Sequence, residues 1–197
     1  MPADSQRLHS LIDFLIVADR MKGIERRTYV GGSERRENDA EHCWHMALCA
    51  LLLHREVGIE ADLGHTLSLV LVHDLVEIYA GDTYAYDDAA LVGQAEREAA
   101  AADLLFGDLP ADVGARMRSL WDEFEAGKTN EAKIARACDR MQGFLQNFIA
   151  EGRSWREHGV TPERTKVRMQ PAYDADPVFG ELLDVLYARA QTRGYFG

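Results

Sequence analysis

Four residues with metal-binding side chains stand out along the chain: His42, the adjacent pair His73-Asp74, and Asp139. Each lies within a mostly apolar stretch, where a polar side chain without a partner is costly to bury. Two imidazoles and two carboxylates form a mixed nitrogen and oxygen ligand set that leaves two positions of an octahedron for water. Such a set suits Mn²⁺, Co²⁺, Fe²⁺, Ni²⁺ or Zn²⁺ better than Mg²⁺. We therefore expect these four residues to bind one divalent metal ion.

Two further acidic residues follow the His-Asp pair. Glu77 comes four residues after His73, so on a continuous helix both side chains face the same side. A carboxylate in that place can hold or deprotonate an attacking water, or protonate a leaving group. Asp82 follows Gly81 just past the expected end of this helix and is a second candidate. A solvated helix-face carboxylate and a loop-capping aspartate are the alternative interpretations.

The segments that must position these residues show the spacing of helices almost throughout. We expect Asp39, Asp62 and Thr129 to lie at helix starts, and the polar segment 22–38 and the segment 161–177 to be irregular. There is no convincing β-alternation, repeat or glycine-rich phosphate loop. The pattern predicts an all-α, single-domain bundle with helices over residues 5–21, 39–57, 62–80, 88–105, 110–127, 129–151 and 178–192.

Length and composition limit the class of protein. A chain of 197 residues with 47% hydrophobic residues suits one domain over 1–197, with a core of about 8–152 and a C-terminal helical extension over 153–197. Three cysteines without a framework spacing indicate free thiols and a cytoplasmic protein. The net charge of −11 argues against a nucleic acid polymer as partner. No apolar stretch predicts a signal peptide or a membrane span.

The arrangement of His42, His73-Asp74 and Asp139 resembles the H…HD…D pattern of HD-domain phosphohydrolases, and their 5′-deoxynucleotidase-like branch above all. The likeness extends over about residues 8–148. It includes the flanking segments 38–42, 73–77, 81–83 and 121–125. The resemblance implies an HD-type helical bundle, a mononuclear metal site and a homodimer. It also implies hydrolysis of a phosphomonoester, often a nucleoside 5′-monophosphate, by attack of a metal-activated water.

The resemblance also implies roles for particular residues. It makes Glu77 catalytic and brings Asp82 into the site. It places a phosphate-binding arginine fifteen residues before the first histidine, which is Arg27, and Arg35 in the same loop is a further candidate because arginine can bind two phosphate oxygens. Solvated surface charge is the alternative interpretation of this loop. The nucleotidase pattern has tryptophan directly after the arginine, whereas this chain has Thr28, so a preference for deoxyribose does not follow.

Two other functions remain open. A phosphodiesterase or pyrophosphohydrolase acting on another nucleotide is the first, but guanosine polyphosphate hydrolases carry a Glu-Asp pair where this chain has Glu77-Ile78. Cyclic nucleotide hydrolases use further histidines between the pair and the last aspartate, and this chain has none there. The second is a non-catalytic, metal-stabilised ligand-sensing protein. Glu77 argues against it, because a structural metal site needs no such carboxylate.

Overall fold

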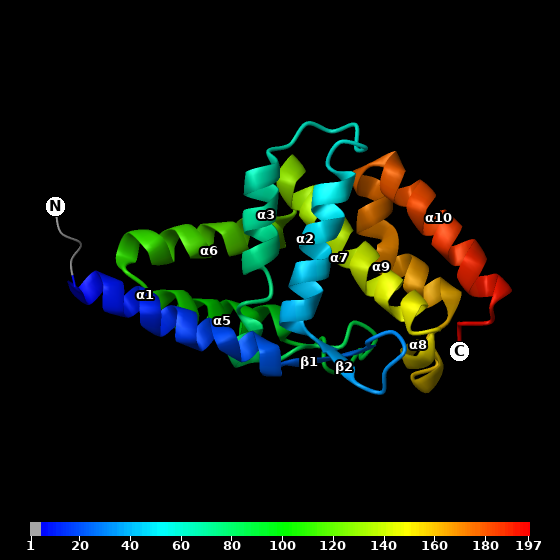
Figure 1. Ribbon diagram of the computed structural model, residues 1–197, viewed down its shortest axis with the longest axis horizontal. Coiled ribbons are helices and arrows are strands. Elements are labelled where there is room, and N and C mark those ends of the chain that lie inside the picture. Colours follow the sequence, from blue (N-terminus) through cyan, green and yellow to red (C-terminus); the bar gives the residue numbers. More distant parts are fainter. Residues whose placement is uncertain (1–4) are drawn as a thin grey trace.

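The computed structural model describes residues 5–197 and shows a bundle of helices with one short hairpin (Figure 1). The expectation of an all-α fold is confirmed. In the described residues the α-helices are α1 (Ser5–Ala18), α2 (Asp39–Leu53), α3 (Leu63–Val72), α4 (Glu77–Ala80), α5 (Gln94–Gly107), α6 (Ala111–Ala126), α7 (Asn130–Ile149), α8 (Arg153–Glu157), α9 (Pro162–Ala175) and α10 (Pro177–Thr192).

The segment expected to be a loop over residues 22–38 instead contains a β-hairpin. A 3₁₀ turn, η1 (Asp19–Gly23), leads into β1 (Glu25–Tyr29), which pairs antiparallel with β2 (Arg36–Asn38). The strand has no apolar alternation because two inward-facing residues, Arg26 and Thr28, are polar and bind buried or partly buried carboxylates. Hydrophobic periodicity therefore could not reveal it.

The helix that carries His42 begins at Asp39 as expected and ends at Leu53 rather than at residue 57, but its capping residue is one position earlier than predicted. Asn38, and not Asp39, is the N-cap of α2. The Asn38 side chain accepts from the backbone N–H of Glu41 at 3.0 Å, and the Glu41 carboxylate accepts from the Asn38 N–H at 3.1 Å. This reciprocal pair is a capping box. The carboxylate of Asp39 is thereby free to turn into the protein, where it is fully buried.

The helix expected over 62–80 is interrupted at the His-Asp pair. Asp62 caps α3 as predicted, and α3 ends at Val72. The ring of His73 then shares a 2.8 Å hydrogen bond with the Val70 carbonyl. The backbone continues through tighter bonds, such as Leu75 N–H to the Val72 carbonyl, before α4 begins at Glu77. A sharp bend thus replaces the expected helix interior.

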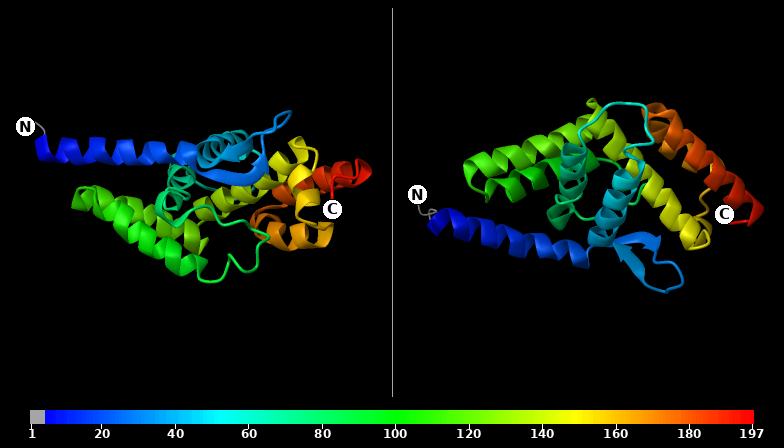
Figure 2. Two further views of the ribbon diagram at one scale, coloured as in Figure 1. Left: turned by 90° about the horizontal axis from the view of Figure 1, so that it is seen from below. Right: turned by 45° about the horizontal axis from the view of Figure 1, so that its top comes forward.

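The C-terminal part differs from expectation in one segment. Most of the segment 161–177 forms α9 rather than irregular chain, because Thr161 caps the helix and Pro162 occupies its first turn, where no N–H is needed. Pro171 lies inside α9 and does not end it. Thr129 caps α7 as predicted. Helix α7 runs through the middle of the molecule and packs against α2, α3 and α9 (Figure 2).

One connected group of buried apolar side chains links α2 and α3 with α5, α6, α7, α9 and α10. The three cysteines are buried and unbonded. By contrast α1 has no buried residue and projects from the body of the protein. Within residues 5–197, none of the helices combines the length and apolarity needed to cross a bilayer.

Candidate metal centre and active site

The structure brings all four expected metal ligands to one place. His42 comes from α2, His73 and Asp74 from the bend after α3, and Asp139 from the middle of α7. Nε2 of His42 lies 3.2 Å from Oδ1 of Asp139 and 3.6 Å from Oδ2 of Asp74. Nε2 of His73 lies 3.1 Å from Oδ1 of Asp74. Both rings are buried, and the side chain of each aspartate is only a little exposed.

A buried hydrogen-bond chain sets the tautomer of His42. The Glu37 carboxylate accepts from the Thr28 hydroxyl and from Nε2 of Gln142, each at 2.8 Å. An ionised carboxylate only accepts, so the amide nitrogen of Gln142 must face Glu37 and its oxygen must face His42. That oxygen lies 2.6 Å from Nδ1 of His42. The Nδ1 atom therefore carries the proton, and Nε2 presents a lone pair toward the carboxylates.

The same reasoning applies to His73, whose Nδ1 faces the Val70 carbonyl. Within the described residues, the Nε2 atoms of His42 and His73 are buried and have no hydrogen-bond partner. Nitrogen lone pairs directed at carboxylate oxygens repel them unless a cation lies between. Burial favours the neutral ring of His73, but favourable interactions, of which the charge of Asp74 is the largest, outweigh it and raise the pKa of this imidazole well above its usual value, so a positive charge is favoured at this position. The donor set thus fits a divalent metal ion held by two nitrogens and two oxygens.

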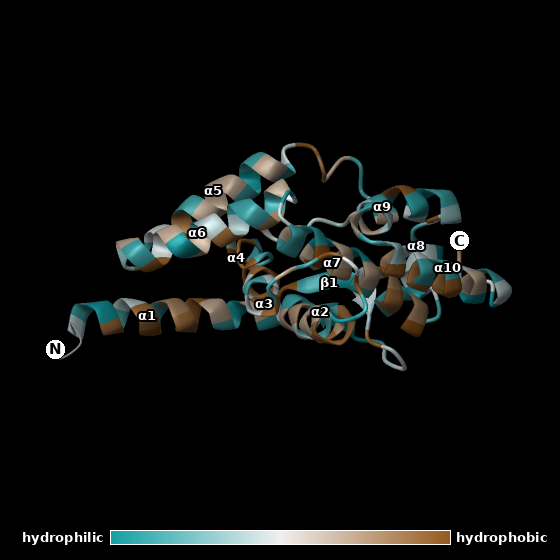
Figure 3. Ribbon diagram, turned by 90° about the horizontal axis from the view of Figure 1, so that it is seen from above, coloured by the Kyte–Doolittle hydropathy of each residue, from teal (hydrophilic) through white to brown (hydrophobic). Residues whose placement is uncertain are grey.

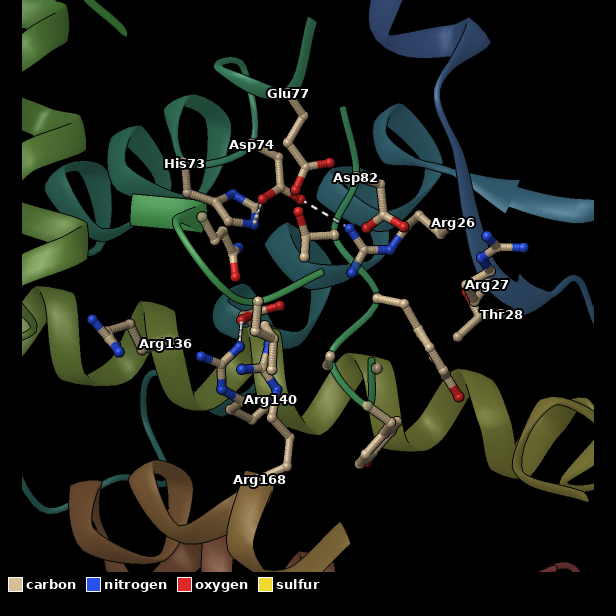
Figure 4. Close-up of a pocket in the computed structure, with 18 of the residues that line it drawn as sticks. Arg26, Arg27, Thr28, His73, Asp74, Glu77, Asp82, Arg136, Arg140 and Arg168 are labelled. Atoms are coloured by element: carbon tan, nitrogen blue, oxygen red, sulfur yellow. Dashed lines mark hydrogen bonds and ion pairs between the residues drawn. The ribbon is translucent and has the colours of Figure 1, made fainter. Parts of the chain in front are cut away.

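A cavity of about 370 Å³ opens next to these ligands (Figure 4). His73, Asp74 and Asp139 form part of its wall. Glu77 and Asp82 line it as well, so the two acidic candidates lie beside the metal ligands. The remaining wall has many aromatic and basic side chains, together with two further carboxylates. The aromatic and basic residues include Tyr84, Tyr86, Phe124, Phe144, Arg26, Arg27, Arg136, Arg140 and Arg168, and the carboxylates are Glu98 and Glu125.

Of the two neighbouring hairpin arginines, Arg26 rather than Arg27 contacts a metal ligand. Nη1 of Arg26 lies 3.0 Å from Oδ2 of Asp74 and 3.2 Å from Oδ1 of Asp39. Arg27 also lines the cavity, but it is exposed, and in Figure 4 its guanidinium points away from the metal ligands. Successive side chains of a strand point to opposite sides, so recognising β1 would have distinguished the two. Arg35 lies outside the cavity wall and forms a two-bond ion pair with Glu41.

Three carboxyl groups cluster beside Arg26. Ligand atoms of Asp39, Glu77 and Asp82 lie within 4.8 Å of one another. Burial, and then the charge of Asp74, raises the pKa of Asp39 to about 6. Burial, Asp74 and Asp39 together raise the pKa of Glu77 well above its usual value. Burial also raises the pKa of Asp82. These groups therefore hold a proton at a higher pH than free carboxylates do. A raised pKa of this kind suits a group that exchanges protons with water or with a leaving group.

The sequence interpretation missed several residues around the site. Their roles depend on contacts between segments far apart in the chain, such as Glu37 with Gln142 across 105 positions. Local signals existed for Arg26, which is next to Arg27, and for Arg140, which is next to Asp139. The residues are Arg26, Glu37, Asp39, Arg140, Gln142 and Arg168.

Comparison with known proteins places this geometry in a family. The HD domain matches residues 18–175. The chain belongs to the HD-domain family. It is 26% identical over 176 residues to a 5′-deoxynucleotidase HDDC2 of Dictyostelium discoideum, covering 85% of this chain and 88% of the relative. It is 28% identical over 138 residues to the Homo sapiens 5′-deoxynucleotidase HDDC2, covering 70% and 66%.

A solved structure extends the similarity to the full length. The crystal structure of a predicted metal-dependent phosphohydrolase from Magnetospirillum magnetotacticum MS-1 is 39% identical, covers 100% of this chain and 98% of its own, and superimposes with a TM-score of 0.92. The expected resemblance to HD-domain phosphohydrolases is therefore confirmed. The helical HD fold predicted from the sequence is confirmed as well.

Proposed function

We propose that this HD-domain protein is a metal-dependent phosphohydrolase that removes phosphate from nucleoside 5′-monophosphates. The observation that carries the proposal is the pair of buried imidazole Nε2 atoms facing Asp74 and Asp139, next to a cavity lined by basic and aromatic residues. The 5′-deoxynucleotidase relatives and the phosphohydrolase neighbour support the same reaction class. A divalent ion bound there would lower the pKa of water and offset charge on the phosphoryl oxygens.

The chain's own residues would perform the remaining steps. Arg26 offers a guanidinium beside the metal ligands, where it can bind a phosphate oxygen. Glu77, with its raised pKa, can take a proton from the attacking water or give one to the leaving sugar oxygen. Asp82 lies within reach of the same water or of the sugar. Tyr84 and Tyr86 provide aromatic surface in the cavity wall for the nucleoside.

We also propose a single ion at this centre, bound by His42, His73, Asp74 and Asp139. Two nitrogen ligands favour Mn²⁺, Co²⁺, Fe²⁺, Ni²⁺ or Zn²⁺ over Mg²⁺. The sugar preference of the relatives is not carried over, because Thr28 places a hydroxyl bonded to Glu37 where the nucleotidase pattern has an indole. Ribo- and deoxyribonucleotides should therefore be assayed in parallel.

Release of inorganic phosphate from a panel of nucleoside 5′-monophosphates, with and without Mn²⁺ or Co²⁺, tests the proposal. Turnover should require the ion, and His73→Ala or Asp74→Ala should abolish metal binding and turnover together. Glu77→Ala should bind the ion but lose turnover, which separates catalysis from a purely structural metal site. Activity confined to phosphodiesters or pyrophosphates, or activity without any metal, would contradict the proposal.

Two statements about the protein in the cell complete the proposal. Three buried, unbonded cysteines suit a reducing compartment and support a cytoplasmic protein. The projecting helix α1 supports a homodimer, since it exposes Leu8, Ile12, Leu15 and Ile16. A small phosphate compound, and not a nucleic acid polymer or a membrane, is the expected partner of a chain with net charge −11.

A further inference from the structure

The cavity has a second basic side that the reaction described above does not use. Arg140 from α7 and Arg168 from α9 lie together there, on the side away from Arg26 (Figure 4). Arg140 donates to Oδ2 of Asp139, whose other oxygen faces His42. This contact fixes one guanidinium directly beside the metal centre. In the described part of the chain, Nε of Arg140 is buried and has no acceptor.

Arg168 lies in an unfavourable setting for a cation. Burial, and then repulsion by Arg140, lowers the pKa of Arg168 to about 10, and attraction by Asp139 offsets this only in part. Across residues 5–197 its guanidinium has no hydrogen-bond acceptor and no ion-pair partner. Two guanidinium groups held together at a cavity wall repel each other, and an anion between them removes that repulsion.

Arg26, by comparison, already has its charge compensated by the protein. Its guanidinium lies within 3.8 Å of carboxylate oxygens of Glu37, Asp39 and Asp74. Among the described residues, the Arg140–Arg168 pair has one carboxylate in direct contact, that of Asp139, which is also a predicted metal ligand. The unbalanced positive charge of the cavity therefore lies at the α7–α9 side. A ligand with two negative charges would therefore be attracted most strongly at this side of the cavity.

We propose that Arg140 and Arg168 form a phosphate-binding subsite that selects a dianionic phosphomonoester over a phosphodiester. The inference rests on the proposed function and names the residues that set its selectivity for monoesters. A phosphomonoester carries a charge of about −1.5 to −2 near neutral pH, whereas a diester carries a single charge and lacks one of the free oxygens. Arg140 and Arg168 bind the non-bridging oxygens from the α7–α9 side while Arg26 approaches from the hairpin. The C-terminal helix α9 thus contributes directly to the active site.

The test compares Arg168→Gln with Lys166→Gln. Lys166 is exposed on the same helix and lies outside the cavity wall, so its substitution makes the same charge change away from the subsite. Two quantities are measured in metal-loaded protein. They are the rise in melting temperature caused by inorganic phosphate, and the ratio of kcat/KM for a nucleoside 5′-monophosphate to kcat/KM for its methyl diester.

Arg168→Gln should weaken phosphate binding about tenfold or more, since charge-assisted hydrogen bonds are lost. The monoester-to-diester ratio should fall by a similar factor, while Lys166→Gln leaves both quantities unchanged. Arg168→Lys keeps the positive charge but loses the paired N–H donors of the guanidinium. Its phosphate binding and its monoester-to-diester ratio should therefore lie between those of the wild type and of Arg168→Gln. This variant also preserves the test if Arg168→Gln fails to fold.

Unchanged phosphate protection in a folded Arg168 variant would overturn the subsite, as would an unchanged monoester-to-diester ratio. Absence of any phosphate protection in the wild type would overturn it too. If the wild type hydrolyses no nucleotide but phosphate protection still depends on Arg168, the subsite stands and the proposed nucleotidase function fails. The two proposals are thereby tested separately.

Discussion

At the scale of single residues, the metal centre depends on side chains that never touch the ion. Glu37 orients Gln142, and Gln142 orients the imidazole of His42. Each of these groups is almost completely buried. Water therefore cannot replace a lost hydrogen bond, so the tautomer of His42 is set by the protein alone.

Removing the amide of Gln142 tests this dependence. We expect Gln142→Leu to weaken binding of Mn²⁺ or Co²⁺ by 10–100-fold, roughly the loss that accompanies removal of outer partners of metal-binding histidines. Competition with a chelator measures the affinity. Gln146→Leu is a matched control, because Gln146 is a buried glutamine one turn further along α7 whose amide binds the Tyr29 carbonyl instead. Equal metal affinities of the two variants would contradict the role of Gln142.

Glu77 should lower the stability of the metal-free protein at neutral and alkaline pH. Its folded-state pKa is raised well above 4.5, mainly by burial. The folded protein therefore holds a proton that the unfolded chain releases, and stability falls as the pH rises from about 4.5 through the raised pKa. Below 4.5 both states are protonated and this loss vanishes.

We therefore expect Glu77→Gln to raise the melting temperature of metal-free protein at pH 8 by about 3 °C or more, and to have little effect near pH 4.5. Thermal unfolding followed by circular dichroism across this range measures the difference. Glu96→Gln makes the same chemical change at an exposed position of α5 and should show no such trend. A stabilisation independent of pH would show that the burial of charge is not its cause.

At the scale of elements, helix starts were predicted where one local contact decides them. Asp62 and Thr129 cap α3 and α7 through bonds to backbone N–H groups three residues ahead. The hairpin and the bend after Val72 could not be predicted, because polar contacts with distant segments stabilise the first and a histidine–carbonyl contact accompanies the second. Helix α9 was not predicted, although Thr161 and Pro162 form a local start signal and Pro171 lies within the helix without ending it.

The same distinction applies to the site. The four ligand residues carry chemistry that is rare in apolar segments, so their types were enough to single them out. The choice between Arg26 and Arg27 required the direction of each side chain along a strand, and the sequence pattern did not reveal that strand. Arg168 could not be predicted as a site residue because the helix that carries it, α9, was not expected.

The capping box of α2 offers a prediction at this scale. Asn38→Ala removes the side-chain acceptor for the Glu41 N–H, so we expect a loss of about 1 kcal/mol and a melting temperature lower by about 2–4 °C. Asn38→Asp retains an acceptor and should preserve stability. Differential scanning calorimetry measures both variants. If Asn38→Ala unfolds at the wild-type temperature, the cap contributes nothing to the folding of α2.

At the scale of the whole molecule, charge is distributed unevenly. The chain carries a net charge of −11, yet Arg26, Arg27, Arg136, Arg140 and Arg168 all line one cavity. A long polyanion would be repelled by the net negative charge of the protein, whereas a small phosphate can enter the cavity and reach the arginines there. The distribution therefore favours a small phosphate ester over a nucleic acid polymer.

The projecting helix α1 is the other feature of the whole molecule that requires explanation. It spans 14 residues and has no buried side chain, although its apolar residues recur at helical spacing. Isolated helices of this length are marginal in water, and most helices gain their stability from an apolar face packed on other elements. Figure 3 shows apolar residues along α1, which lies on the same side as α2 and α3. A second copy of the chain would bury this face.

We expect the wild type to be a dimer and the double variant Leu15→Glu, Ile16→Glu to be a monomer. These side chains are 68% and 65% exposed within one chain, so the substitutions disturb an interface between chains more than the fold of either chain. Size-exclusion chromatography with light scattering gives the mass in solution. Leu104→Glu is the control, because Leu104 is 65% exposed on α5, away from this side, and should leave the dimer intact. A wild type with the mass of one chain, or a double variant that remains dimeric, would contradict the role of α1 as the interface. Contacts within one chain would then have to stabilise this helix.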